Sequence, residues 1–267
     1  HEDGAWVWDN LPPLPYPTSW AATCAIGSSI YVCGGADYDA KRFYTVTDRS
    51  GAVEHYGSLM HALDSKHPEA GWKALKSCPG TPRCCAGTAF VDGKLYLIGG
   101  VATTRAEGAL CNVVDSWLYD PERDAWKRLR DMPISGSGSS STPNLNLYKG
   151  RYLVLPCGYQ YESYMKPNGE TAPKYGTPST VERTWKNHPR FETTHYYNHC
   201  YVYDVRTDLY GTATALPFDD VASITIIVRD IMYILPGETA GFVWEGEYFG
   251  HHPEFVLKGD IKELDWQ

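Results

Sequence analysis

Four short segments of the chain can be laid over one another, and their repetition constrains the fold more than any other feature of the sequence. They read IYVCGGA, LYLIGGV, YLVLPCG and MYILPGE, and they begin at Ile30, Leu95, Tyr152 and Met232. Each follows a polar turn and an earlier strand-like run, a pattern that indicates a hairpin. The second and third lead into two further strand-like runs around an Asp-initiated turn, as in WLYDPERDAWKRLRDMP. The sequence therefore predicts repeated four-stranded units, none of which can bury both of its faces alone.

The unit resembles the kelch motif of β-propellers, because a glycine pair, a Tyr-Asp pair and a Trp follow one another in that order. The resemblance implies an all-β fold, a kelch-type β-propeller with four recognisable blades. We expect residues 1–267 to form one domain. The segment GAWVWDNLPPLP resembles the last strand of a blade, and PEFVLKGDIKELDW resembles a third strand. We expect these N- and C-terminal strands to close the ring in one sheet.

Two stretches of sequence, at about 37–56 and 160–197, lengthen the repeats beyond the roughly 50 residues of a kelch unit. Both follow the second strand of their repeat. Insertions at this point would overhang one mouth of the propeller, where such proteins bind ligands. A surface loop or a subunit contact is the alternative for each insertion, and self-association stays open.

Charge and composition exclude several classes of partner and cofactor. The formal net charge of -8, without a basic run, argues against nucleic acid as a partner. No apolar run reaches the roughly 20 residues that span a bilayer, so no membrane association is expected. The 8 cysteines lack CxxC spacing, which favours buried thiols, with disulfides as the alternative. We expect no metal and no cofactor, since copper ligation would need Tyr and His ligands that nothing in the sequence specifies.

Glu238 is the most informative candidate residue. The aligned repeats place Ala36, Val101, Gly158 and Glu238 at the same point, just past the second strand and near the central channel. A carboxylate is costly to bury there unless it is paired or hydrogen-bonded, which favours a functional role. The alternative is a structural one, in which Glu238 accepts backbone N–H bonds and fixes the mouth of the channel.

The segment FVWEGEYFGHHPEF, downstream of Glu238, is the densest cluster of ionisable and aromatic residues in the chain. His251 and His252 can act as an acid or a base near neutral pH, while Trp244 and Tyr248 can stack on a sugar face. Adjacent residues of an extended segment point to opposite sides, so at most one histidine faces a ligand. The alternative for each histidine is a packed or surface side chain.

Three further residues are candidates for substrate binding. Arg83 lies where kelch repeats place an arginine at the start of the innermost strand, and Arg105 follows the second glycine pair. Either could bind a sugar carboxylate in a bidentate pair, whereas bracing of adjacent blades is an equally supported role for Arg83. Gln160 begins the longer insertion and is a candidate contact at the same mouth.

Beyond the kelch motif, the order of details resembles the N-acetylneuraminate epimerases, bacterial sialic acid mutarotases with six blades. WKALKSCPGTPRCCAGTAFVDGKLYLIGG resembles that family's junction between its first two blades, and MYILPGETAGF followed by FVLKGDIKELDWQ resembles its closing segment. In the family a catalytic Glu follows a glycine, and Gly237-Glu238 matches that pair. Trp244 stands where the family has an arginine.

The resemblance implies a sugar-acting isomerase that opens and recloses a pyranose ring with Glu238 as base and His252 or His251 as acid. The substrate implied is a small sialic-acid-like sugar, in the periplasm or outside the cell, although the cysteines fit a reducing compartment equally well. Fold does not decide function, so a non-catalytic kelch module that binds a glycan or a protein is the main alternative. A polysaccharide lyase or glycosidase that uses the Tyr and His residues of the same mouth is a third.

Overall fold

Strands dominate the structure, a computed structural model that describes residues 8–36, 46–47, 53–54, 56–103, 111–133, 146–161, 163–165, 171–173, 194–218, 220–238, 242–244, 247–249 and 252–262. The helices in these ranges are two short 3₁₀ turns, η1 (Tyr56–Ser58) and η2 (Pro68–Ala70). None of the helices in these ranges is long and apolar enough to span a membrane. The all-β fold class predicted from the repeats is confirmed.

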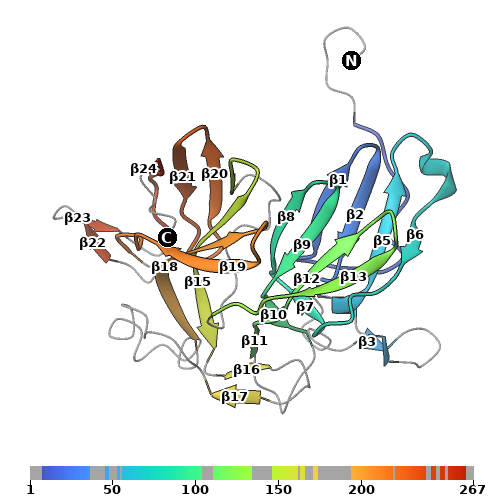
Figure 1. Cartoon of the computed structure of the whole chain (residues 1–267), viewed down its shortest axis with the longest axis horizontal. Coiled ribbons are helices and arrows are strands. Elements are labelled where there is room, and N and C mark those ends of the chain that lie inside the picture. The colour runs from blue at the N-terminus through green and yellow to red at the C-terminus, as the bar shows by residue number, and fades with distance from the viewer. Residues whose placement is uncertain are drawn as a thin grey trace, which may run out of the picture.

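Each of the four repeats forms its own antiparallel sheet, and we number the sheets 1 to 4 along the chain (Figure 1). Neighbouring strands along the sequence pair in every sheet, as expected of hairpins. The strands are β1 (Ala22–Ile26), β2 (Ser29–Cys33), β5 (Met60–Asp64) and β6 (Lys73–Leu75) in sheet 1; β8 (Gly87–Val91), β9 (Lys94–Ile98), β12 (Ser116–Asp120) and β13 (Ala125–Leu129) in sheet 2; β14 (Leu147–Tyr148), β15 (Tyr152–Tyr161), β18 (Thr194–Asp204) and β19 (Leu209–Ala213) in sheet 3; and β20 (Ile224–Val228), β21 (Ile231–Leu235) and β24 (Leu257–Asp260) in sheet 4.

The glycine pairs mark places where the backbone of one repeat passes very close to that of another. Gly34 and Gly35 both have positive φ, at 67° and 97°, a conformation that side chains other than glycine rarely adopt. A Cβ atom on Gly34 would lie 2.7 Å from the Arg83 carbonyl oxygen, and the Gly35 N–H donates to that same oxygen. The glycine pair is therefore required by the contact between the end of β2 and the start of the next repeat.

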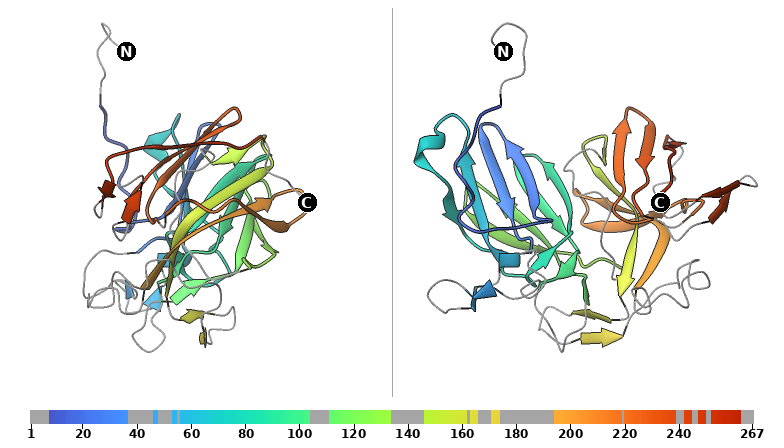
Figure 2. Two further views of the ribbon diagram at one scale, coloured as in Figure 1. Left: turned by 90° about the vertical axis from the view of Figure 1, so that its left-hand side faces the viewer. Right: turned by 180° about the vertical axis from the view of Figure 1, so that it is seen from behind.

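The core lies between successive sheets, as the failure of a lone sheet to bury both faces predicts. Sheets 1 and 2 form one half of the molecule, and sheets 3 and 4 form the other (Figures 1 and 2). The side chains that join neighbouring sheets include Tyr31 and Leu97 between sheets 1 and 2, Tyr96 and Tyr203 between sheets 2 and 3, and Val154 and Met232 between sheets 3 and 4.

The tyrosine of the Tyr-Asp pair bonds to a second aspartate, five residues later, and closes the turn between the third and fourth strands. The Tyr119 hydroxyl donates to Asp124 at 2.7 Å, and the Tyr203 hydroxyl donates to Asp208 at 2.8 Å. An aromatic ring of the fourth strand packs on each tyrosine, with ring centroids 4.9 Å apart for Tyr119 and Trp126. The repeated motif therefore encodes a buried, hydrogen-bonded tyrosine at the same place in sheets 2 and 3.

The predicted N-terminal strand falls partly on residues 4–7, so its pairing with sheet 4 stays a prediction for those residues. Residues 8–18 form no strand, and residues 1–7 lie outside the described part of the chain. Trp72 donates its indole N–H to the Pro12 carbonyl at 2.8 Å, and the Tyr16 ring packs against His61 of β5. The segment therefore covers the face of sheet 1 that points away from sheet 2. The predicted C-terminal strand does form, since β24 pairs with β21.

One face of sheet 4 is apolar and exposed. Ile224, paired with Leu235, is 43% exposed, and Val228 on the same face is 52% exposed. The opposite face contributes Ile227 and Met232 to the core shared with sheet 3. Among the described strands, sheets 2 and 3 have a neighbouring sheet on both faces, whereas sheet 4 has one on a single face.

Both predicted insertions contain short strands at one end of the sheets, the lower end in Figure 1. β15 and β18 remain paired out to Tyr161 and Thr194, well beyond the other strands of sheet 3. The remaining short strands are β3 (Val46–Thr47), β4 (Val53–Glu54), β7 (Arg83–Cys84), β10 (Val101–Ala102), β11 (Cys111–Val113), β16 (Ser163–Met165), β17 (Thr171–Pro173), β22 (Phe242–Trp244) and β23 (Glu247–Phe249). β16 pairs with β11, so the long insertion joins the repeats of sheets 2 and 3 at this end.

The six cysteines whose side chains the structure describes are free thiols, as the favoured interpretation predicted. Burial raises the pKa of Cys24 and of Cys200 to about 12, so neither thiol ionises near neutral pH. Cys111 and Cys157 have side chains outside the described part. The described thiols act as small apolar core residues.

Candidate functional site

Glu238 occupies the position that the repeat alignment predicted. Its backbone forms an isolated bridge with Val221, just as Ala36 bridges Ser19 and Val101 pairs with Cys84. Ala36 and Val101 are buried together in a small apolar cluster, whereas Glu238 is half-buried. The fourth repeat therefore places a carboxylate where the first two place aliphatic side chains.

A second carboxylate, Asp220, lies beside Glu238 and was missed by the sequence interpretation. Asp220 is 0% exposed, and its Oδ1 accepts the backbone N–H groups of Val221 at 2.9 Å and Gly237 at 3.1 Å. It corresponds to Arg83, because the carbonyl of Asp220 accepts the Gly158 N–H as that of Arg83 accepts the Gly35 N–H. Each precedes the first strand of its sheet by the same number of residues, a spacing that could have identified Asp220.

His252 is connected to Asp220 through the main chain of Gly237. Its Nδ1 lies 3.0 Å from the Gly237 carbonyl oxygen. Because a carbonyl oxygen can only accept, Nδ1 carries the proton of this bond. A Cβ on Gly237 would lie 2.3 Å from the Val221 carbonyl, so only glycine fits between Asp220 and His252. The Asp220 carboxylate and the His252 imidazole therefore both bond to the Gly237 main chain, next to Glu238 at the end of β21.

The remaining candidates are distributed as follows. Trp244 and Tyr248 lie in the β22–β23 hairpin, which the chain forms between Glu238 and His252. Gln160 lies in the extended part of β15, paired with His195. His251 and Arg105 lie outside the described residues. Of the predicted residues at this mouth, His252 is therefore the one that contacts the residue preceding Glu238.

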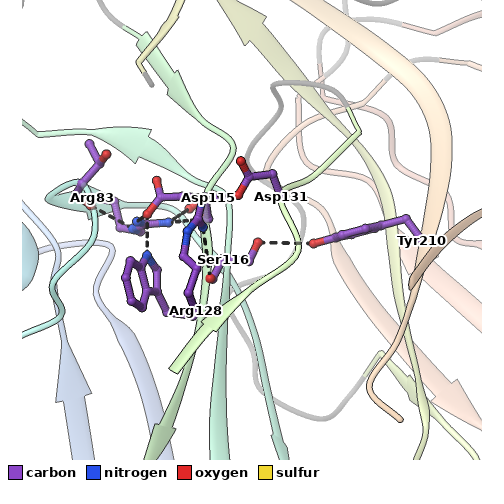
Figure 3. Close-up of polar contacts among 9 residues, drawn as sticks. Arg83, Asp115, Ser116, Arg128, Asp131 and Tyr210 are labelled. Carbon is purple, nitrogen blue, oxygen red and sulfur yellow. Dashed lines mark hydrogen bonds and ion pairs between the residues drawn. The ribbon is translucent and has the colours of Figure 1, made fainter. Parts of the chain in front are cut away.

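Arg83 is held inside the protein rather than presented to a ligand (Figure 3). It is 1% exposed, and its guanidinium donates to the carbonyls of Thr81, Gly99 and Asp115 and to the Asp115 carboxylate. These four bonds use four of its five N–H donors. The geometry therefore favours the bracing alternative, and a substrate carboxylate has no access to this guanidinium.

The Arg83 and Asp115 pair belongs to a polar cluster that reaches sheet 3 (Figure 3). The Trp117 indole also donates to the Asp115 carboxylate, while Arg128 pairs with Asp131. The Ser116 hydroxyl lies 3.3 Å from that of Tyr210, which belongs to β19. This cluster joins β7, which contains Arg83, to the start of β12. Through Ser116 and Tyr210 it also links sheet 2 to sheet 3.

Acid should weaken the fold through Asp115 and Asp204. Burial alone would raise the pKa of Asp115, but the charge of Arg83 and hydrogen bonds from Trp117 and Arg83 outweigh it and lower the pKa. A hydrogen bond from Arg151 is the main cause that lowers the pKa of Asp204. A carboxyl with a lowered native pKa stabilises the fold above its unfolded pKa of about 3.9, and that contribution is lost as pH falls through the native pKa.

We therefore expect the urea midpoint to change little from pH 7 to 5 through these two groups and to fall below about pH 4. Asp204→Asn should make the acid limb shallower, because one of the two groups no longer titrates. Equal acid limbs for the wild type and the variant would contradict the assignment to Asp204.

Among the described residues, no group of three or more His, Cys, Asp or Glu side chains could hold a metal ion. The chemistry that the described site can offer is acid–base catalysis by carboxylates and an imidazole.

Comparisons with known proteins give relatives for this fold. Residues 82–133 match the family described as Kelch motif. The chain is 26% identical over 222 residues to the N-acetylneuraminate epimerase of Yersinia pestis (strain Pestoides F), covering 79% of this chain and 53% of that protein. It is 29% identical over 154 residues to the N-acetylneuraminate epimerase of Haemophilus influenzae (strain PittEE), covering 56% of this chain and 36% of that protein.

A solved structure described as "Structure of YjhT" matches 94% of this chain and 65% of its own, with a TM-score of 0.60 and 18% identity. This likeness supports the propeller-like fold alone. The chain spans about half the length of the curated relatives it matches. The repeats thus form a kelch-type, propeller-like fold.

Proposed function

We propose that this kelch-repeat protein, which resembles the N-acetylneuraminate epimerases, is an anomeric epimerase of sialic-acid-like sugars. The observation that carries the proposal is that Asp220 and His252 both bond to the Gly237 peptide, directly before Glu238, where the first two repeats have only aliphatic residues at the Glu238 position. The names of the relatives supply the substrate class.

The reaction needs one base and one acid and no redox step. The Glu238 carboxylate takes the proton of the anomeric hydroxyl, whose oxygen becomes a carbonyl as the bond from the anomeric carbon to the ring oxygen breaks. The ring oxygen keeps that electron pair and takes a proton from Nε2 of protonated His252. Rotation about the bond to the carbonyl carbon, followed by the reverse steps, closes the ring on the other face. Positioned acid–base groups contribute about 10²- to 10⁴-fold in such steps.

Asp220 serves this reaction as a positioning residue. It accepts the N–H of Gly237, and the carbonyl of Gly237 accepts the Nδ1–H of His252, so one peptide unit connects the buried carboxylate to the imidazole. The Glu238 N–H is fixed separately by the Val221 carbonyl at 2.9 Å. Preorganised groups of this kind need no rearrangement during the reaction.

The other candidates complete the proposal as substrate contacts. Trp244 and Tyr248 would stack on the sugar face, Arg105 would pair with the substrate carboxylate, and Gln160 would hydrogen-bond a sugar hydroxyl. His251 is the alternative acid.

Proton NMR of freshly dissolved, single-anomer N-acetylneuraminate tests the proposal directly. Faster approach of the anomeric signals to equilibrium with the protein than without it is the expected result. No acceleration for a panel of sugars would overturn the proposal, and new reducing ends would instead indicate a lyase or glycosidase.

The second candidate function is a non-catalytic module that binds a glycan or a protein. The extension of β15 and β18 beyond sheet 3, with the added strands β16 and β17, favours it, because it builds a surface at the ligand-binding end. In that case, shortening the 160–197 insertion removes binding, while Glu238→Gln alters stability alone.

A further inference from the structure

A pocket of basic and aromatic residues lies at the end of sheet 3 opposite to the end of the second strands where Glu238 lies. β15 begins at this pocket and runs toward Gly158, the residue that aligns with Glu238. The pocket has a volume of about 320 Å³, large enough for a small organic molecule. Its lining residues are Tyr148, Lys149, Arg151, Tyr152 and Arg206.

The same turns in sheet 2 provide an internal reference for this pocket. Lys149 corresponds to Asp92, since each precedes the turn glycine of its first hairpin and both have the same unusual backbone, with φ of 50° and 49°. The position therefore accepts either charge at the same conformation. Sheet 3 carries a cation where sheet 2 carries an anion.

The turn between the third and fourth strands shows a second exchange of charge. Arg206 donates its backbone N–H to Asp204 at 3.0 Å, and Glu122 donates to Asp120 at 3.1 Å in the equivalent turn. Arg206 thus stands where sheet 2 has an acidic residue. Sheet 3 therefore has Lys149 and Arg206 at the two positions where sheet 2 has Asp92 and Glu122, and the turns share the same backbone contacts.

The cations are held in place by different partners. Arg151 donates from Nε and Nη2 to the two oxygens of Asp204, at 2.8 and 2.5 Å, so one acidic group neutralises one cation. Its guanidinium also lies over the Tyr152 ring, and the Lys149 ammonium lies 4.7 Å from the centre of the Tyr148 ring. The Tyr148 hydroxyl donates to Asp230 at 2.7 Å, which fixes that ring.

Asp204 pairs with Arg151 and Asp230 lies near Lys149, so the three cations Lys149, Arg151 and Arg206 exceed the nearby acidic groups by one. No ion pair to an acidic side chain is found for Lys149 or Arg206 among the residues that the structure describes. In a chain with a formal net charge of -8, such a pocket is a local site of opposite potential.

We propose that this pocket binds a small organic anion of monosaccharide size through its carboxylate or phosphate group. Arginine and lysine are the side chains that bind such groups, and the volume exceeds the need of a single inorganic ion. The site is separate from Glu238 and does not depend on the proposed epimerase activity.

Isothermal titration of the full chain at low salt tests this site with three sugars, glucose 6-phosphate, glucuronate and uncharged glucose, and with inorganic sulfate as a reference ion. We expect binding of the two sugar anions and none of glucose, with affinity that falls as salt is added. The double variant Lys149→Asp with Arg206→Glu should weaken anion binding by about tenfold or more, because it replaces both attractions by repulsions. The new residues are of the types that sheet 2 already has at these positions, so the fold should survive.

The control is Arg123→Glu with Lys127→Asp, which makes the same change in net charge on exposed positions of sheet 2. It should leave anion binding intact, and the pocket variant should leave any mutarotation intact. Equal loss in both variants would show a general charge effect and overturn the proposal. Equal binding of inorganic sulfate and glucose 6-phosphate would overturn the selectivity for an organic anion.

Discussion

Glu238→Gln is expected to abolish protein-dependent mutarotation of N-acetylneuraminate, a loss of about 10²-fold or more. The amide keeps the size of the side chain but cannot take the proton of the anomeric hydroxyl. The bridge between Glu238 and Val221 uses backbone atoms alone, so the variant should fold normally. Anomeric proton NMR gives the rate, and a urea melt gives the stability.

Glu254→Gln is the control variant, because it removes a nearby carboxylate that has no proposed role in the reaction. Glu254 is exposed and lies two residues beyond His252, so Glu254→Gln should keep the wild-type rate. Full activity in the Glu238→Gln variant would remove Glu238 from the mechanism. If the wild type shows no mutarotation and Glu238→Gln lowers the stability, Glu238 has a structural role in a binding module.

Arg83→Met is expected to lower the free energy of unfolding by about 3 to 5 kcal/mol, because it leaves the Asp115 charge buried without its partner. Arg83 and Asp115 are among the most buried residues described, at 1% and 0% exposed. The variant also removes donors from the carbonyls of Thr81 and Gly99. Urea denaturation followed by tryptophan fluorescence measures the change.

The double variant Arg83→Met with Asp115→Leu should recover part of the loss, since neither charge remains in the interior. Recovery should be incomplete because the two carbonyls still lack donors. Lys94, which forms a partly exposed pair with Asp120 at 3.6 Å, supplies the control: Lys94→Met should cost about 1 kcal/mol or less. An equally small effect of Arg83→Met would contradict the role of Arg83 as a buried brace.

The repeat pattern was sufficient to predict the sheets because it reflects constraints that act over a few residues. A hairpin needs a polar turn between two apolar runs, and the glycine pair is needed where backbones nearly touch, as at Gly34. Alignment of the repeats therefore also located the backbone position of Glu238, since Ala36, Val101 and Glu238 pair with equivalent residues, whereas Gly158 lies within β15.

Three features depended on contacts between distant segments and could not be predicted in this way. Residues 8–18 lie on sheet 1 because Trp72 donates to Pro12 and because Tyr16 packs against His61. The role of Arg83 depends on Asp115, which follows a strand of the same repeat but lies far along the sequence. The basic pocket joins two turns of sheet 3 that more than fifty residues separate, so its charges appeared scattered in the sequence.

Asp220 is different, because the sequence contained its signal. Its distance from β20 matches that of Arg83 from β8, but the change from a base to an acid hid the equivalence. Positions equivalent in the fold need not keep their charge. The comparison of Asp92 with Lys149 shows the same freedom at the other end of the sheets.

The unequal coverage of the sheet faces makes the described array thermodynamically asymmetric. In a stack of repeats, each unit is stabilised by its own interior and by each neighbour it touches. Sheet 1 has the N-terminal segment over its outer face, whereas the Ile224 and Val228 face of sheet 4 is about half exposed among the described residues. Sheet 4 is therefore the unit with the smallest local free energy of opening, and the carboxylates at the end of β21 belong to the repeat that opens first.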